Sequence, residues 1–373
     1  MGVSPQPVET MLRTQIKPRR LAFFIHSLEM GGAERVLSLL AMELSKENFV
    51  RVYLFDSRKN NFDVGNLAVD LQLPAVQGSL SKVFLLLRRV WAIGGVVKEN
   101  NYDQVITFME GSSLPAAIAA FLGGWGKKLT VSVRQNPYAY NFFVRLLMKL
   151  FYRPIIKVNT NSLGSKNALE QLLGRPVLLV HNPVHVPRAL SGPATSSPFN
   201  RYFLFLGRLD PVKRVTDIVT GFGLATKKIP DDVGLCIVGG GPDYENISKK
   251  VAELNLGHRV RMFGPLMQPD QLLSNSEAVI LASQTEGWPN VLLEAIQAHR
   301  KIIASDCNFG PREILEGVGT PENLFPVGDT SVLAEKMIHV LSHKDENYSK
   351  RCEEFFRRFE VSEIARQWVN NER

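Results

Sequence analysis

The strongest constraint on the fold comes from a short apolar run that leads through a polar loop into a helical pattern. Residues 278–282 read A-V-I-L-A, which is typical of a buried parallel strand. After the loop 283–289, the apolar spacing at Val291, Leu292, Ala295 and Ile296 predicts a helix that begins at residues 289–290. Such a unit places the free backbone N–H groups of a helix N-terminus at the carboxyl edge of a sheet. Open α/β sheets bind ligands at this edge, and helix N-termini bind anions.

The same pattern recurs along the chain, so we expect an α/β protein with parallel sheets. At 373 residues, the chain is long enough for two domains that each have a core. The predicted strands are residues 21–27, 50–55, 102–108, 129–133, 177–181, 202–206, 234–238, 260–264, 278–282 and 301–305. The helical patterns outside the first-described unit are residues 33–46, 80–97, 141–157 and 351–370.

A proline-rich segment divides the two groups of strands. Residues 187–198 read P-R-A-L-S-G-P-A-T-S-S-P, and prolines among small polar residues rarely form a helix or strand. We therefore predict a hinge there, between Rossmann-like domains at residues 19–186 and 199–350. A helical segment, residues 351–373, follows the second domain.

Composition indicates a globular protein of a reducing compartment. Apolar residues make up 45% and charged residues 21% of the chain. The cysteines, Cys236, Cys307 and Cys352, are far apart, so neither a disulfide framework nor a zinc site is expected. Residues 1–20 lack the apolar core of a signal peptide, and no apolar run reaches the roughly 18 residues of a spanning helix. We expect a cytoplasmic protein.

Positive charge is concentrated in the first half. Residues 1–190 hold 23 Lys and Arg against 12 Asp and Glu (+11), and residues 191–373 hold 21 against 24 (−3). An anionic membrane surface, a phosphorylated acceptor or nucleic acid would suit this charge, but no nucleic-acid-binding motif accompanies it. Residues 80–97 and 141–157 mix large apolar residues with Lys and Arg, which favours helices at a membrane interface. Core-facing helices with a solvated basic face are the alternative.

Charged and glycine residues collect at the predicted strand ends. Glu286 and Glu294 can face one cleft, where carboxylates would bind sugar or ribose hydroxyls, although an exposed loop and a solvated helix explain them equally well. Arg208 and Lys213, five apart around a turn, can converge on a diphosphate. Paired glycines after a strand allow a ligand to approach the backbone, or serve only the turn geometry. They occur at residues 31–32 and 239–241.

These motifs resemble those of the retaining, nucleotide-sugar-dependent glycosyltransferases of family 4, also called group 1. The resemblance rests on E-x7-E at residues 286–294, G-R-L-x-x-x-K-R at 207–214 and G-G-A-E-R-V at 31–36. It covers the second domain from residue 207 to 315, whereas the first domain matches through its glycine loop and strand order. It implies the GT-B fold, with two Rossmann-like domains facing across a cleft and a C-terminal helix crossing back to the first domain.

The resemblance also implies roles for individual residues. Arg208 and Lys213 would neutralise the leaving diphosphate, Glu286 would hold the donor sugar and Glu294 the ribose. The sequence lacks an Asp-x-Asp metal motif, so we expect metal-independent transfer with a UDP-sugar as co-substrate and no other cofactor. The remaining residues predicted to contact the donor, several of them through backbone groups, are Gly31, Gly32, Gly239, Gly241, Phe263, Gly287, Trp288, Pro289 and Asn290.

Acceptor contacts are predicted in the first domain. Many relatives carry a histidine close to the acceptor where this chain has Arg134. Because arginine cannot act as a base, Arg134 would instead hold an anionic or hydroxyl-rich group. Asn136 lies in the same loop, and Glu110 follows the preceding strand, where a simple helix entry is the alternative.

Together these features predict a retaining glycosyltransferase of surface polysaccharide or lipopolysaccharide biosynthesis. It would move a hexose or N-acetylhexosamine from a UDP-sugar to a lipid-linked or polysaccharide acceptor, at the inner face of the plasma membrane. A sugar-nucleotide epimerase on the same fold and a non-catalytic nucleotide-sugar-binding protein are the alternatives.

Overall fold

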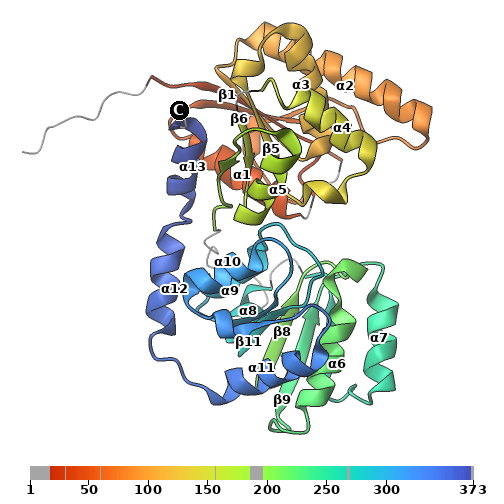
Figure 1. Cartoon of the computed structure of the whole chain (residues 1–373), viewed down its shortest axis with the longest axis vertical. Coiled ribbons are helices and arrows are strands. Elements are labelled where there is room, and N and C mark those ends of the chain that lie inside the picture. The colour runs from red at the N-terminus through yellow and green to blue at the C-terminus, as the bar shows by residue number, and fades with distance from the viewer. Residues whose placement is uncertain are drawn as a thin grey trace, which may run out of the picture.

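The computed structural model describes residues 17–29, 31–58, 60–155, 157–184, 196–266 and 269–370. These residues form two parallel sheets, each covered by helices, one in the upper and one in the lower half of Figure 1. The expected architecture of two Rossmann-like domains is confirmed. The predicted hinge falls largely in residues 185–195, outside the described residues, so the domain boundaries stay a prediction.

The first sheet has the strand order β3-β2-β1-β4-β5-β6-β7. Its order reverses between β1 and β4, which makes the carboxyl ends of these two strands the topological switch point. The strands are β1 (Arg20–Ile25), β2 (Phe49–Leu54), β3 (Ala68–Asp70), β4 (Gln104–Phe108), β5 (Leu129–Val133), β6 (Lys157–Thr160) and β7 (Leu178–Leu179).

The second sheet has the order β10-β9-β8-β11-β12-β13, so its switch point lies between β8 and β11. All strand pairs in both sheets are parallel. The strands are β8 (Arg201–Leu206), β9 (Val233–Val238), β10 (Val260–Gly264), β11 (Ala278–Leu281), β12 (Lys301–Ser305) and β13 (Leu324–Phe325).

Helices connect the strands of each sheet. In the first domain they are α1 (Gly32–Leu44), α2 (Ser79–Asn100), α3 (Glu110–Gly123), α4 (Phe142–Phe151) and α5 (Leu163–Leu173). In the second domain they are α6 (Val215–Ala225), α7 (Tyr244–Glu253), α8 (Asp270–Asn275), α9 (Asn290–Gln297), α10 (Pro311–Val318) and α11 (Thr330–Ser342).

Two helix predictions are wrong in length. The pattern at residues 141–157 gives a helix only to Phe151, because Pro154 follows and a proline cannot continue the backbone hydrogen bonds. The pattern at residues 351–370 is divided between α12 (Tyr348–Arg357) and α13 (Val361–Asn370). The break allows the chain to change direction between the two domains.

The C-terminal segment crosses back as expected. Helix α12 lies against α9 and α10 of the second domain, whereas α13 lies beside α1 of the first (Figure 1). Gln104 Nε2 in β4 donates to the backbone carbonyl of Trp368, 3.1 Å away, and the Trp368 ring stacks on Phe108 at 5.2 Å between centroids. One hydrophobic cluster accordingly includes side chains of both domains.

Candidate active site

The two switch points bring the predicted motifs to facing loops. In the first domain, Gly31 and Gly32 follow β1 and Glu110 follows β4. In the second domain, Arg208 follows β8 and Glu286 follows β11. Parallel strands end at one edge of a sheet, so each pair of loops is adjacent, and this is the position where such sheets bind ligands.

The starts of α1 and α9 meet between the domains. Asn290 Nδ2 donates to the Gly32 carbonyl at 3.3 Å, and Asn182 Nδ2 donates to Asn290 Oδ1 at 2.7 Å. A Cβ atom on Gly32 would lie 3.1 Å from Asn290 Nδ2, and one on Gly287 would lie 2.5 Å from the Arg134 carbonyl oxygen. Gly32 and Gly287 therefore permit close approach of the two domains.

Glu286 is held in place by a cation and a hydroxyl group. Lys213 Nζ lies 2.6 Å from Glu286 Oε1, and Ser283 Oγ donates to the same oxygen at 2.5 Å. Only 10% of the Glu286 side chain is exposed. The ion pair thus joins Glu286, which is predicted to bind the donor sugar, to Lys213, which is predicted to bind the diphosphate.

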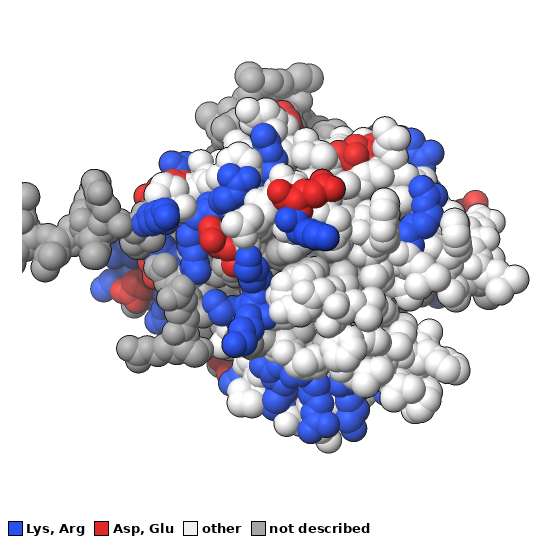
Figure 2. All heavy atoms as spheres, turned by 90° about the horizontal axis from the view of Figure 1, so that it is seen from above, with Lys and Arg blue, Asp and Glu red and all other residues white. Residues whose placement is uncertain are grey.

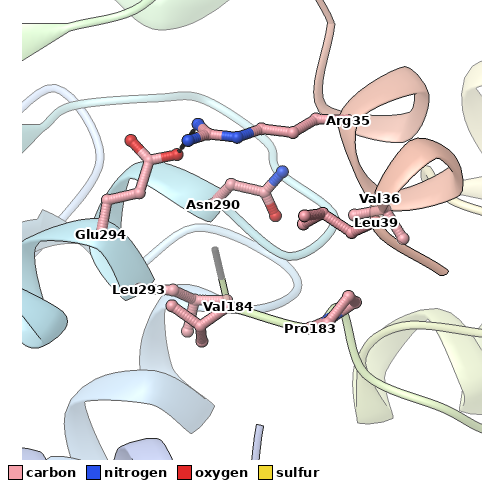
Figure 3. Close-up of a pocket in the computed structure, with 8 residues that line it drawn as sticks. All are labelled: Arg35, Val36, Leu39, Pro183, Val184, Asn290, Leu293 and Glu294. Carbon is pink, nitrogen blue, oxygen red and sulfur yellow. Dashed lines mark hydrogen bonds and ion pairs between the residues drawn. The ribbon is translucent and has the colours of Figure 1, made fainter. Parts of the chain in front are cut away.

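Glu294 is paired with a residue of the other domain. Its Oε1 accepts a hydrogen bond from Arg35 Nη1, which reaches across from the first turn of α1 (Figure 3). Both residues and Asn290 line a pocket whose other walls are formed by Val36, Leu39, Pro183, Val184 and Leu293. Burial raises the pKa of Glu294, and the Arg35 charge offsets part of that increase.

Arg208 is not joined to Lys213 in this structure. Its side chain is 71% exposed and forms an ion pair with Asp210 at 2.6 Å. Asp210 also caps the short turn that carries Lys213, since its Oδ1 accepts from the backbone N–H of Val212 at 3.1 Å. Convergence of Arg208 and Lys213 on a diphosphate stays a prediction that requires the Arg208 side chain to reorient.

The glycines of the 239–241 loop are required by the protein itself. A Cβ atom on Gly239 (φ +146°) would lie 1.8 Å from the Gly207 carbonyl oxygen, and one on Gly241 (φ +154°) would lie 2.2 Å from the Leu209 carbonyl oxygen. The loop thus packs against the backbone that carries Arg208. The Gly239 N–H donates to the Gly264 carbonyl at 2.8 Å, next to Phe263 at the end of β10.

Trp288 contributes to the contact between the domains. Its ring lies 4.2 Å from that of His181 and 5.7 Å from that of Phe359, and the residue is 5% exposed. Only its backbone can therefore take part in donor binding without rearrangement. Pro289 occupies the N-cap position of α9, where its backbone is extended (φ −71°, ψ 106°).

Arg134 lies inside the protein. Its Nε donates to Ser132 Oγ at 2.7 Å and its Nη1 to Asn182 Oδ1 at 2.6 Å, and the guanidinium packs on Phe108 and Trp368. Burial lowers the pKa of Arg134 to about 9. Its Nη2 is buried without a hydrogen-bond partner, so the predicted acceptor contact stays a prediction that requires the side chains around Arg134 to move.

The other two predicted acceptor residues, Asn136 and Glu110, differ in whether their side-chain oxygens already have hydrogen-bond partners. The Asn136 side chain accepts from the Tyr138 N–H at 2.9 Å and caps a short turn, which is a structural role. One Glu110 oxygen accepts from the Tyr140 hydroxyl, and the other is buried without a partner. Burial raises the pKa of Glu110 to about 7, so a neutral carboxyl group is accessible near neutral pH.

Several site residues were not anticipated by sequence reasoning. Arg35 belongs to the G-G-A-E-R-V motif, but its spacing gave no sign of a partner in the second domain. Asn182 sits before a proline at a predicted strand end, and Ser283 opens the loop that carries Glu286. Tyr140 had no distinguishing pattern. Within the described ranges, no group of three or more His, Cys, Asp and Glu side chains could hold a metal ion, and metal independence stays a prediction.

Comparisons with known proteins point to one family. The sequence model described as "Glycosyl transferases group 1" matches residues 195–358. The chain is 26% identical over 361 residues, covering 94% of this chain and 97% of its relative, to "GalNAc-alpha-(1->4)-GalNAc-alpha-(1->3)-diNAcBac-PP-undecaprenol alpha-1,4-N-acetyl-D-galactosaminyltransferase" of Campylobacter jejuni.

Solved structures share the fold over nearly the whole chain. The apo form of the lipopolysaccharide outer core galactosyltransferase WaaB superposes with a TM-score of 0.70 at 23% identity, covering 94% of this chain and 98% of that one. Anabaena HepE in complex with UDP and glucose superposes with a TM-score of 0.69 at 20% identity and the same coverage. These similarities establish a common architecture.

Proposed function

Because this chain belongs to the group 1 glycosyltransferases, we propose that it moves a hexose or N-acetylhexosamine from a UDP-sugar to a lipid-linked or polysaccharide acceptor. The chain is a transferase of glycan biosynthesis with the GT-B fold. UDP is proposed because a structure of the same fold holds UDP and glucose. A lipid-linked acceptor is proposed because the full-length relative is named for a substrate on undecaprenol diphosphate.

The observation that carries the proposal is the cation–carboxylate pairing at the facing loops. Glu286 with Lys213, and Glu294 with Arg35, place two carboxylates and two cations beside the starts of α1 and α9. Carboxylates accept hydrogen bonds from sugar and ribose hydroxyls, whereas cations and free N–H groups at helix starts bind phosphate. A sugar nucleotide requires both kinds of group.

The proposed reaction depends on stabilising the leaving group. The C–O bond between the anomeric carbon and the diphosphate breaks while an acceptor hydroxyl attacks that carbon. Lys213, a reoriented Arg208 and the start of α9 would neutralise the negative charge that develops on the phosphate, which is typically the largest contribution to such catalysis. The Glu286 carboxylate would accept hydrogen bonds from the hydroxyl groups of the donor sugar and so hold its ring.

We further propose that transfer retains the anomeric configuration. Attack on the face that the diphosphate leaves, with the departing phosphate oxygen taking the acceptor proton, needs no side chain on the opposite face of the ring. Product configuration read by NMR tests this step. An inverted product would contradict it.

The test of the main proposal is sugar transfer with and without Lys213. A panel of nucleotide sugars is offered with a polyprenyl diphosphate-linked glycan, and transfer is followed by the mass of the product. We expect Lys213→Ala to lower turnover about a hundredfold. Lys250→Ala is the matched control, because it removes a lysine whose ion pair with Glu253 has the same 2.6 Å separation in the same domain.

The outcomes separate the candidate functions. Transfer at the wild-type rate by Lys213→Ala would refute the assigned site. Release of free epimerised sugar without transfer would favour an epimerase, and donor binding without any turnover would favour a binding protein.

We also propose that the first domain rests on an anionic membrane through α2 and α4. Among the described residues these helices expose large apolar side chains, including Leu80 (88% exposed), Trp91 (84%) and Phe143 (73%). Helix α3 contacts both α2 and α4, and the Phe121 ring near the end of α3 packs against Phe151 of α4. Each helix buries apolar side chains in the core, namely Ile93 and Val97 of α2 and Met148 of α4. Each also leaves large apolar side chains exposed on its outer face, which a core-facing helix with only a basic solvated face would not do.

The charge around these helices favours anionic lipid. Helices α2 and α4 contain six Lys and Arg residues, although Arg89 turns inward, and one acidic residue, Glu99. Figure 2, which looks down on the first domain, shows groups of basic side chains beside a broad uncharged area. Exposed apolar and basic side chains together are typical of a surface that lies in a membrane interface. None of the helices in the described part of the chain has the length and apolar character to cross a bilayer.

Vesicle flotation tests this surface. We expect the protein to float with vesicles containing phosphatidylglycerol at low salt, and less so at high salt because ions screen the attraction. Trp91→Ser combined with Phe143→Ser should reduce flotation, whereas Leu254→Ser, an exposed apolar residue of the second domain, should not. Absence of binding at low salt would refute attachment to the inner face of the plasma membrane.

A further inference from the structure

We propose that Arg35 is a donor-binding residue that exchanges partners: it holds Glu294 when the site is empty and moves to the donor diphosphate when the ribose hydroxyls bind Glu294. This inference rests on the proposed function of the site. It adds a cation from the first domain to those that the second domain supplies.

The position of Arg35 supports this exchange. Its backbone N–H donates to the Gly31 carbonyl at 3.1 Å, so the residue lies in the first turn of α1. Figure 3 shows its side chain extending from α1 over Asn290 toward Glu294 on α9. Since Asn290 also bonds to Gly32, the guanidinium lies where the starts of two helices approach each other. An anionic group at that place would meet two helix dipoles and one cation.

The burial of Glu294 favours a pairing with Arg35 that a donor can replace. The Glu294 side chain is 16% exposed, and an unpaired carboxylate at such a position is unfavourable. Arg35 compensates this charge while no donor is present. When ribose hydroxyls donate to the carboxylate, its hydrogen-bonding capacity is satisfied, and the guanidinium can pair with phosphate, for which its planar fork is well suited.

The proposed exchange predicts a different effect of losing Arg35 on ligand binding than a purely structural Arg35–Glu294 contact between the domains does. If Arg35 contacts phosphate, its loss weakens the binding of a nucleoside diphosphate but not of the nucleoside alone. If Arg35 merely competes for Glu294, its loss strengthens both. If it only holds the domains together, its loss affects both ligands alike.

Isothermal titration of UDP and uridine into the full-length protein distinguishes these cases. We expect Arg35→Gln to weaken UDP binding about tenfold or more, the effect of losing one charge-assisted contact, while uridine binds unchanged or more tightly. Arg35→Lys, which keeps the charge but not the fork, should recover part of the UDP affinity. It also serves as the second variant should Arg35→Gln fold poorly.

Arg201→Gln is the matched control. It removes an arginine that pairs with Glu277 at 2.6 Å, away from the site, and should leave both affinities unchanged. Arg35→Gln with an unchanged ratio of UDP to uridine affinity, or with tighter UDP binding, would overturn the exchange. If the wild-type protein binds neither UDP nor any other nucleoside diphosphate, the proposed function itself fails, so the two failures are distinguishable.

Discussion

Substitution of Gly239 by alanine tests how the 239–241 loop supports the diphosphate-binding loop. The new Cβ atom would lie 1.8 Å from the carbonyl oxygen of Gly207, whereas Cβ contacts below 3.0 Å essentially never occur. The two backbone segments must therefore separate by at least 1.2 Å, the difference between these distances. The positive φ of +146° adds strain, because residues with a Cβ atom rarely adopt that conformation.

The displacement acts directly on the site. Gly207 precedes Arg208, and the Leu209 N–H donates to the Gly240 carbonyl at 2.9 Å, so the two loops cannot separate without moving Arg208 or losing that bond. A misplacement of about 1 Å in an active site costs about a hundredfold in rate. The strained backbone should lower the free energy of unfolding by about 1–3 kcal/mol.

The measurement combines transfer rate with urea unfolding. Gly257→Ala is the matched control, since a Cβ atom on Gly257 meets no atom within 4 Å. We expect Gly239→Ala to lose about a hundredfold in turnover and Gly257→Ala to behave as wild type. A folded Gly239→Ala protein with wild-type turnover and stability would show that the loop tolerates the separation, and would refute the reasoning.

Two further predictions concern Glu110 and Glu313. The pKa of Glu110 is raised from 4.5 to about 7, so between these pH values the folded protein retains a proton that the unfolded chain releases, and this residue's contribution to stability is lost as pH rises. The stability of Glu110→Gln relative to wild type, measured by thermal unfolding, should therefore increase as the pH rises from about 5 to about 7.5. The same stability difference between the two proteins at both pH values would contradict the raised pKa. Glu313 of the second domain accepts from the Leu163 N–H at the start of α5, so Glu313→Ala should lower the free energy of unfolding by about 1 kcal/mol in urea, and no change would mean that water replaces this cap.

The sequence by itself determined the elements and the loops that carry the chemistry. Strands β8, β9 and β11 were predicted to within one residue of their observed bounds, because their apolar runs between turn residues report burial on both faces of a sheet. Strand β6 was missed, since its sequence K-V-N-T is half polar although Asn159 and Thr160 are buried. Periodicity cannot identify a buried polar strand.

Only the tertiary structure decided which groups meet. Lys213 and Glu286 are 73 positions apart, and Arg35 and Glu294 are 259 apart, yet each pair is in contact. Local patterns describe one element at a time, whereas these contacts depend on how two sheets and the C-terminal helices pack together. For the same reason Trp288, Gly287 and Arg134 were predicted as ligand contacts from their loops. The structure shows that they also join the domains, because the Trp288 ring lies against His181 of the first domain and Gly287 lies against the Arg134 carbonyl oxygen.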